Sequence, residues 1–146
     1  MSPDDVPDGP LLVDADVVSY LHAQSGRHAD FEPLLAGHLL VVSFAAYAEV
    51  LAKGFKAGLG SPRMGALRRT LSGYVVLPYS SAVAEVWARV APKVQGHLHA
   101  GGANDLWSAA VAVTYQPQLP VVTNNLADFQ AIRQHLPGLV LVHPDV

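Results

Sequence analysis

The chain has 146 residues, of which 51% are hydrophobic and 14% charged, so it is long enough for one domain that buries a sizeable core. Its mean hydropathy of +0.27 and its dispersed glycines and prolines exclude a disordered tail, a low-complexity segment and a coiled coil. Because it contains no cysteine, disulfides, thiolate nucleophiles and cysteine-type zinc sites are excluded as well.

Two segments bear on where the protein is expected to act. Residues 1–10 are acidic and proline-rich instead of basic and then apolar, so they do not resemble a secretory signal and are expected to form a flexible arm. The longest apolar run, residues 39–52, contains Ser43 and Glu49 and is shorter than the roughly 20 residues needed to cross a bilayer. We therefore expect no membrane span and a cytoplasmic protein.

The first predicted elements are a strand, two helices and a second strand. Residues 11–13 form a short apolar run that Asp14 closes, and the helical spacing that follows predicts a helix with Asp16 as its N-cap. A second helix is predicted at residues 28–37. The near-continuous apolar segment 38–43 is typical of a strand buried on both faces of a parallel sheet.

The same alternation continues to the C-terminus. An apolar stripe predicts a long helix from Phe44 to about Gly58, and Ser61-Pro62 begins a basic helix. The later predicted elements are a strand at 74–79, a helix from 81 to about 97, a glycine-rich loop, a helix that begins at Asn104-Asp105, a strand at 120–123, a helix at 126–136 and a strand at 139–142. This alternation predicts a single three-layer α/β/α domain over residues 11–146, with a central parallel sheet of four to five strands.

Acidic and hydroxyl side chains occur where the predicted strands end or soon after. The strand ends are Asp14, Ser43 and the turn of Thr123, Asn124 and Asn125, and Asp105 occupies the first turn of its helix. Because the functional crevice of a parallel sheet lies beyond the carboxyl ends of its strands, these side chains are expected to converge there. Glu49, within two turns of Ser43, belongs to the same set. Crowded carboxylates repel, and a hard divalent cation such as Mg²⁺ or Mn²⁺ makes their arrangement favourable.

The net charge of −3 does not argue against a nucleic-acid partner once the positions of the acids are considered. Three of the twelve acids lie in the N-terminal arm, and five lie at the predicted edge of the sheet, Asp14, Asp16, Glu49, Asp105 and Asp128. The remaining acids are outnumbered by nine lysines and arginines. A basic body around an acidic pit suits a polyanion that is held against bound cations.

Four segments of this chain resemble a known family. LLVDADVVSYL, VVSFAAYAEV, NDLWSAAVA and VVTNNLADF, in this order and at about this spacing, are similar to PIN-domain ribonucleases, specifically the VapC-type toxins of bacterial toxin–antitoxin pairs. The resemblance extends from Leu11 to Val142. It implies that Asp14, Glu49 and Asp105 are the first three acids of the site. Ser43 and Thr123 would orient them, and Asn104 would support the site.

The family's fourth acid falls at or near Asn125, where this chain has an amide. Asp128, one turn on, is the candidate that compensates for it. An amide oxygen is a neutral and weaker ligand for Mg²⁺, so this departure leaves open whether the site binds one metal ion or two.

The activity implied by the resemblance is Mg²⁺-dependent endonucleolytic cleavage of structured RNA, such as tRNA or a ribosomal RNA loop. Asp14 and Asp105 would bind the metal most directly, Glu49 would bind it or orient the attacking water, and Asn125 with Asp128 would complete the outer side. The candidates for contacts with RNA phosphates are Lys53, Lys56, Arg63, Arg68 and Arg69. The resemblance also implies a cognate VapB-type antitoxin and a homodimer.

Three other interpretations remain open at this stage. Asp14 and Asp16 also resemble the nucleophile and general acid of haloacid-dehalogenase-like phosphatases, although Glu49 and Asp105 then have no role. Asn125 is compatible with a non-catalytic PIN-like binding module. The pair His97 and His99 resembles a chelating motif, but its glycine neighbours favour a loop.

Overall fold

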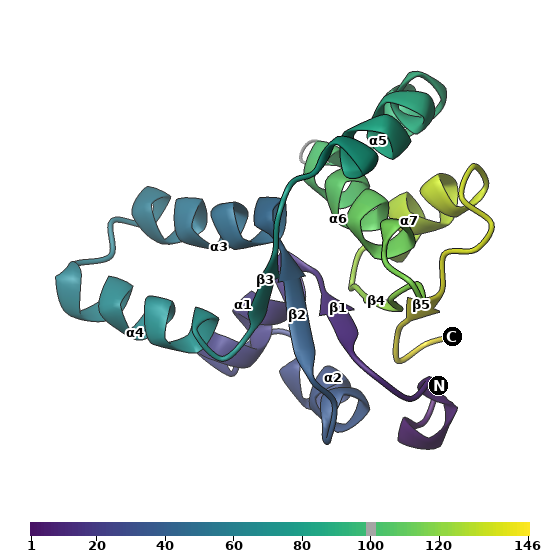
Figure 1. Cartoon of the computed structure of the whole chain (residues 1–146). Helices are drawn as coiled ribbons and strands as arrows, with labels where there is room; N and C mark the ends of the chain where they lie inside the picture. The colour runs from purple at the N-terminus through teal and green to yellow at the C-terminus, as the bar shows by residue number, and fades with distance from the viewer. Residues whose placement is uncertain (99–101) are drawn as a thin grey trace.

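The computed structural model of the chain describes residues 1–98 and 102–146, and its centre is one parallel sheet (Figure 1). The strand order is β3-β2-β1-β4-β5, and every pairing is parallel. The strands are β1 (Leu11–Val13), β2 (Leu40–Ser43), β3 (Val75–Leu77), β4 (Val121–Val122) and β5 (Leu141–Val142). This confirms the predicted parallel α/β architecture, with five strands.

Helices cover both faces of the sheet. They are α1 (Ala15–Ala23), α2 (His28–Leu35), α3 (Phe44–Lys56), α4 (Ser61–Leu71), α5 (Ser81–Val94), α6 (Gly102–Thr114) and α7 (Leu126–Arg133). Short 3-10 turns, η1 (Pro3–Asp5) and η2 (Gln95–His97), complete the described elements.

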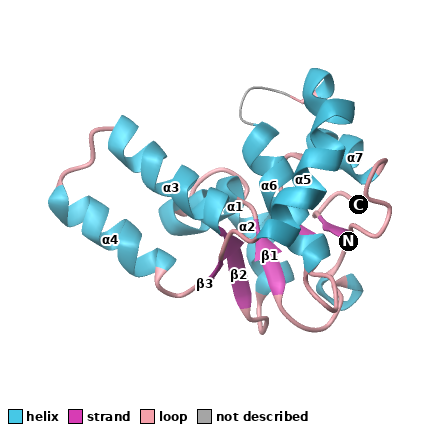
Figure 2. Ribbon diagram, turned by 45° about the horizontal axis from the view of Figure 1, so that its top comes forward, coloured by secondary structure: helices cyan, strands magenta, loops and turns pink. Residues whose placement is uncertain are grey.

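The two faces of the sheet have separate hydrophobic cores, because successive strand residues point to opposite sides. Leu12 packs with apolar residues of α5, α6 and α7, whereas its neighbours Leu11 and Val13 pack with α1, α2, α3 and α4. Beyond this layer, α3 and α4 form a hairpin that projects from the body of the molecule (Figures 1 and 2).

The strand order changes direction between β1 and β4. The chain places β2 and then β3 on one side of β1, and later returns to place β4 and β5 on the other side. Such a switch point opens a crevice at the carboxyl ends of the two central strands. Asp14 follows β1 and Thr123 follows β4, so both residues lie at this crevice.

The structure corrects the predicted start of α1. The N-cap is Asp14 and not Asp16, because the Asp14 side chain accepts a hydrogen bond from the backbone N–H of Ala15. Both residues are good N-cap types, and the choice depends on where the strand stops. Since β1 ends at Val13, Asp16 falls inside the first turn of the helix.

The N-terminal arm contacts the C-terminal end of the chain. The amino group of Met1 donates a hydrogen bond to the backbone oxygen of Pro144 at 3.0 Å, and Val6 is buried. Among the described residues, we find no helix of the length and apolar character that a membrane span requires.

Candidate active site

Asp14 is held at the switch point by donors from the segments that follow the two central strands. One carboxylate oxygen accepts from the N–H of Ala15 at 2.9 Å, and the other accepts from the hydroxyl of Thr123 at 3.0 Å. The Thr123 hydroxyl also accepts from the N–H of Asn125 at 2.9 Å. Thr123 and Asp14 are both buried, so this network fixes the position of the Asp14 carboxylate.

Asn125 links two further acids. Its amide nitrogen donates to an oxygen of Asp105 at 2.7 Å and to an oxygen of Asp128 at 3.0 Å. Asp105, in the first turn of α6, and Asp128, in the first turn of α7, are each only 5% exposed. The amide therefore bridges two buried carboxylates that would otherwise repel each other.

Glu49 enters the site from α3. It is half-buried, and its carboxylate accepts a hydrogen bond of 3.3 Å from the amide of Asn104 on α6. The charge of Glu49 acts to raise the pKa of both Asp14 and Asp105. Glu49 therefore belongs electrostatically to the same cluster as the two buried acids.

Ser43, which the resemblance places among the residues that orient the acids, makes two hydrogen bonds in the structure. Its hydroxyl accepts from the N–H of Ala46 at 3.0 Å, which caps α3, and it shares a 2.8 Å hydrogen bond with the hydroxyl of Ser108. These bonds join α3 to α6, and the orienting role of Ser43 stays a prediction. Sequence reasoning missed Ser108, for which the available signal was its position one turn after Asp105 on the same helix.

The electrostatics of the cluster favour a bound cation or bound protons. Burial, aided by the charges of Asp16 and Glu49, raises the pKa of Asp14 to about 7, even though the Ala15 N–H and the Thr123 hydroxyl act to lower it. Burial and the charge of Asp14 raise the pKa of Asp105 to about 8, against the lowering effect of the Asn125 amide. The charges of the described residues 1–98 and 102–146 therefore do not keep these carboxylates ionised at their usual pKa.

The donor chemistry of the cluster fits a hard divalent ion, because all the available donors are carboxylate or amide oxygens. Within residues 1–98 and 102–146, however, no three acidic or histidine side chains are arranged so that they could hold one ion together. The predicted metal set of Asp14, Glu49 and Asp105 stays a prediction. His97, of the predicted histidine pair, is exposed in η2, and His99 lies outside the described residues.

Five basic residues were predicted to contact RNA. Within the described part of the chain, Lys53 is the one of them that forms an ion pair near the acids. Its amine lies 2.6 Å from an oxygen of Asp16. Burial acts to lower the pKa of Lys53, but Asp16 and the charges of Glu49 and Asp14 raise it above its usual value. The sequence predicted a helix cap for Asp16 and did not predict this pairing.

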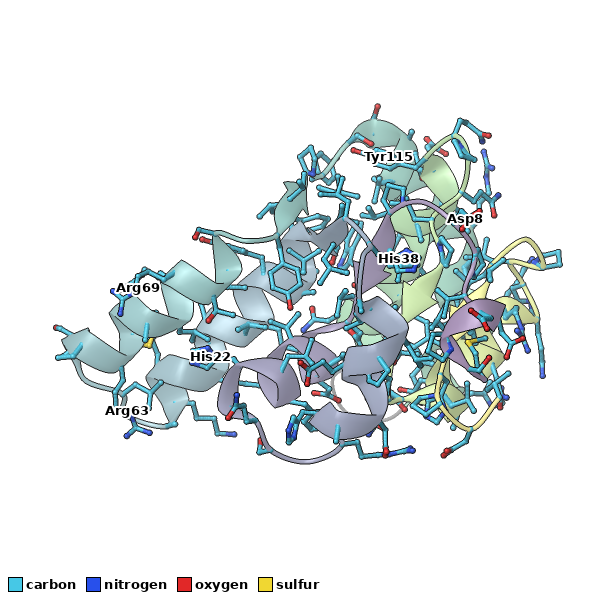
Figure 3. All side chains as sticks on the ribbon, turned by 90° about the horizontal axis from the view of Figure 1, so that it is seen from below. Asp8, His22, His38, Arg63, Arg69 and Tyr115 are labelled. Carbon is cyan, nitrogen blue, oxygen red and sulfur yellow. The ribbon has the colours of Figure 1, made fainter. Side chains whose placement is uncertain are left out.

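The other four predicted RNA-contacting side chains are exposed on the α3–α4 hairpin. Figure 3 shows Arg63 and Arg69 on this projecting hairpin, and the guanidinium of Arg68 lies 5.9 Å from the centre of the Phe55 ring. One of the five predicted residues, Lys53, therefore lies beside the acids, and the other four are exposed on the projecting hairpin.

The fold and the site define a parallel α/β protein with a buried acidic cluster at the switch point of its sheet. A family model described as the PIN domain matches residues 11–133, and the chain belongs to this family. This membership overturns the alternative of a haloacid-dehalogenase-like phosphatase. No curated protein sequence matches the chain.

Solved structures confirm the fold. A chain of VapBC2 from Rickettsia felis, solved bound to a DNA fragment from its promoter, superposes with a TM-score of 0.71 at 20% identity, covering 91% of this chain and 97% of that one. A chain of VapBC-1 from nontypeable Haemophilus influenzae gives a TM-score of 0.69 at 23% identity, with 94% and 99% covered. A chain of FitAcB from Neisseria gonorrhoeae gives 0.66 at 23% identity, with 92% and 97% covered.

Proposed function

We propose that this chain is a VapC-type toxin that cleaves structured RNA in the cytoplasm by Mg²⁺- or Mn²⁺-dependent hydrolysis of phosphodiester bonds. The observation that carries the proposal is the burial of Asp14, Asp105 and Asp128, from three separate segments, at the switch point of the sheet. Burying carboxylates together costs stability unless a bound cation or bound protons neutralise their charge, and such clusters occur mainly at functional sites. The similarity to chains of VapBC complexes supports the toxin assignment.

The residues of the cluster have distinct roles in this proposal. Asp14 and Asp105, with Glu49, would hold the divalent ion, which supplies charge neutralisation at the phosphate and lowers the pKa of an attacking water. Ala15 and Thr123 hold Asp14 in one orientation. Asn125 holds Asp105 and Asp128. Glu49, which accepts a hydrogen bond from Asn104 and is less buried than the aspartates, would bind the ion or orient the attacking water.

The proposal is tested by incubating the purified protein with total RNA, with Mg²⁺, with Mn²⁺ or with EDTA, and mapping the new 5′ ends. We expect discrete cleavage positions that need the divalent ion. The Glu85→Gln variant is the matched control, because Glu85 is an exposed acid on α5 whose ion-pair partner is Arg89. It is expected to retain most of the cleavage. The absence of new ends with either ion contradicts the nuclease proposal.

A non-catalytic PIN-like module is the second candidate. It is favoured by the Asn125 amide, because its nitrogen donates to Asp105 and Asp128 and a donating N–H cannot bind a cation. A titration with Mn²⁺ separates the two candidates, because a binding module with a degenerate site is expected to bind no ion. We further propose a cognate VapB-type antitoxin that blocks the site and a homodimer that brings two sites together.

Neutralising Arg63, Arg68 and Arg69 together is expected to weaken RNA binding and to reduce the slope of log K against log salt by up to about 3, because each phosphate contact releases counterions. Filter-binding titrations at several salt concentrations measure both quantities. Arg27→Gln is the control, since its guanidinium already pairs with Asp30 and Asp145. An unchanged salt slope in the triple variant removes the hairpin from the RNA-binding surface.

A further inference from the structure

A hollow of about 380 Å³ lies between α3 and α6, directly beside the acidic cluster. Among its lining residues are Phe44, Ala48, Glu49, Ala52, Asn104 and Trp107. Glu49 is therefore shared between this hollow and the candidate active site. A molecule that occupies the hollow lies next to the carboxylate proposed to orient the attacking water.

The floor of the hollow is made of small side chains on one face of α3. Ala45, Ala48 and Ala52 follow one another at helical spacing and all line it. On the opposite wall, Asn104 and Trp107 are three residues apart on α6, so that an amide and an indole face the same space. The hollow thus has three parts. Its floor is the row of alanines, its aromatic wall is Phe44 with Trp107, and its polar rim is Glu49 with Asn104.

The aromatic wall is held in position by further rings. Trp107 stacks on Trp87 of α5, with ring centres 4.9 Å apart and planes 17° apart. Phe44 lies 5.5 Å from Trp107 at a steep angle of 64°, and Tyr79 packs edge-on against Phe44 at 6.3 Å. Because each ring is fixed by its neighbour, the wall loses little conformational entropy when a flat ligand binds.

We propose that this hollow binds one nucleobase of the RNA substrate, next to the cleaved phosphodiester bond. The inference rests on the proposed nuclease function. Single-stranded RNA bases are recognised by stacking on aromatic side chains and by hydrogen bonds to their edges. Phe44 and Trp107 supply the aromatic surface, and the Asn104 amide supplies both a donor and an acceptor for a base edge.

The polar rim favours a base over the apolar face of a second copy of the chain. Covering the hollow with apolar side chains would bury the Glu49 carboxylate and the Asn104 amide further without new hydrogen-bond partners, which is costly. The exocyclic amino groups and ring N–H groups of a nucleobase are donors that suit both. A nucleobase therefore satisfies the aromatic wall and the polar rim at once.

The test uses tryptophan fluorescence, which does not depend on cleavage. The chain has two tryptophans, so Trp87→Phe leaves Trp107 as the only reporter. This variant is titrated with adenosine, guanosine, cytidine and uridine without divalent ions. We expect saturable quenching by at least one nucleoside. The same titration of the parent chain serves if Trp87→Phe does not fold.

Filling the hollow supplies the second arm. Ala48→Leu adds bulk at an exposed helix position, and Ala29→Leu makes the same change on α2, away from the hollow. We expect Ala48→Leu to weaken nucleoside binding about tenfold, comparable to the loss of one stacked base, and to shift the mapped cleavage preference, whereas Ala29→Leu changes neither.

The outcomes distinguish this inference from the proposed function. If the parent chain cleaves RNA and Ala48→Leu cleaves the same positions at the same rate with unchanged quenching, the nucleobase site is overturned and the nuclease stands. If no nucleoside quenches Trp107 and Ala48→Leu instead lowers the oligomeric mass in light scattering, the hollow is an interface between copies and the inference is overturned. If the parent chain cleaves no RNA, the proposed function itself fails.

Discussion

The Asp105→Asn variant is expected to lose at least about a hundredfold in RNA cleavage while becoming more stable than the parent chain in metal-free buffer. Both effects come from one property of the parent residue. Asp105 is 5% exposed, and burial together with the charge of Asp14 raises its pKa to about 8. Near pH 8.5 the folded chain must therefore carry a buried, poorly compensated charge.

Removing that charge keeps the shape and the main contact of the side chain. The amide oxygen that the substitution introduces can still accept the hydrogen bond that Asn125 donates to Asp105 at 2.7 Å in the parent chain. We expect the free energy of unfolding to rise by about 1–3 kcal/mol at pH 8.5, since one pKa unit corresponds to about 1.4 kcal/mol. A neutral amide is also a weaker ligand for Mg²⁺, which accounts for the loss of cleavage.

Urea denaturation at pH 8.5 with EDTA measures the gain in stability, and the RNA cleavage assay measures the loss of activity. Glu85→Gln is the matched control, because Glu85 is exposed on α5 and its contact with Arg89 is 3.8 Å long. It should change neither quantity. Full cleavage by Asp105→Asn would remove Asp105 from the catalytic machinery, and a loss of stability would contradict the electrostatic argument.

In metal-free buffer the free energy of unfolding should fall by about 2–4 kcal/mol as the pH rises from 6.5 to 9. The folded pKa values of Asp14 and Asp105, about 7 and about 8, lie above the usual value of 3.8. Over this range the folded chain therefore binds more protons than the unfolded chain. The stabilisation is fully present below the unfolded pKa and is lost as the pH passes through the folded values.

The lower limit of pH 6.5 keeps a second group out of the measurement. Burial lowers the pKa of His143, so that its contribution to stability is lost mainly below its ordinary pKa of 6.5. Thermal or urea unfolding at each pH gives the profile. Adding Mg²⁺ should restore stability most at the alkaline end, because an ion that binds only the folded state stabilises it by mass action.

The double variant Asp14→Asn, Asp105→Asn is the control for this profile. It lacks both carboxylates with raised pKa, so its stability should be nearly constant between pH 6.5 and 9 and should respond little to Mg²⁺. A flat profile for the parent chain would show that the two acids are not strained by burial. An equal response of parent and double variant to Mg²⁺ would place the ion elsewhere.

The alternation of elements and the parallel sheet were predictable from sequence because their signals are local. The run at 11–13 and the segment 38–43 are apolar on both faces, as strands covered by helices on either side must be, and the structure places β1 and β2 there. The rule that functional groups follow the carboxyl ends of strands then selected Asp14 and Thr123, which meet across the switch point.

Local rules were insufficient where two residues satisfied them equally. Asp14 and Asp16 are both suitable N-caps, and only the end of β1, determined by its pairing with β2 and β4, decides that Asp14 is the cap. The pairing of Asp16 with Lys53 joins α1 to α3 and leaves no pattern in the sequence.

The amino-acid order by itself determined which segments are strands and helices and which acids stand at their ends, because hydrophobic periodicity and helix capping act over a few residues. Only the tertiary structure decided that Ser43 bonds Ser108, that Asn125 bridges Asp105 and Asp128, and that Trp107 faces Phe44 beside Glu49. Apart from the bond between Asn125 and Asp128, these contacts join residues far apart in the chain, and their geometry depends on how the helices pack on the sheet.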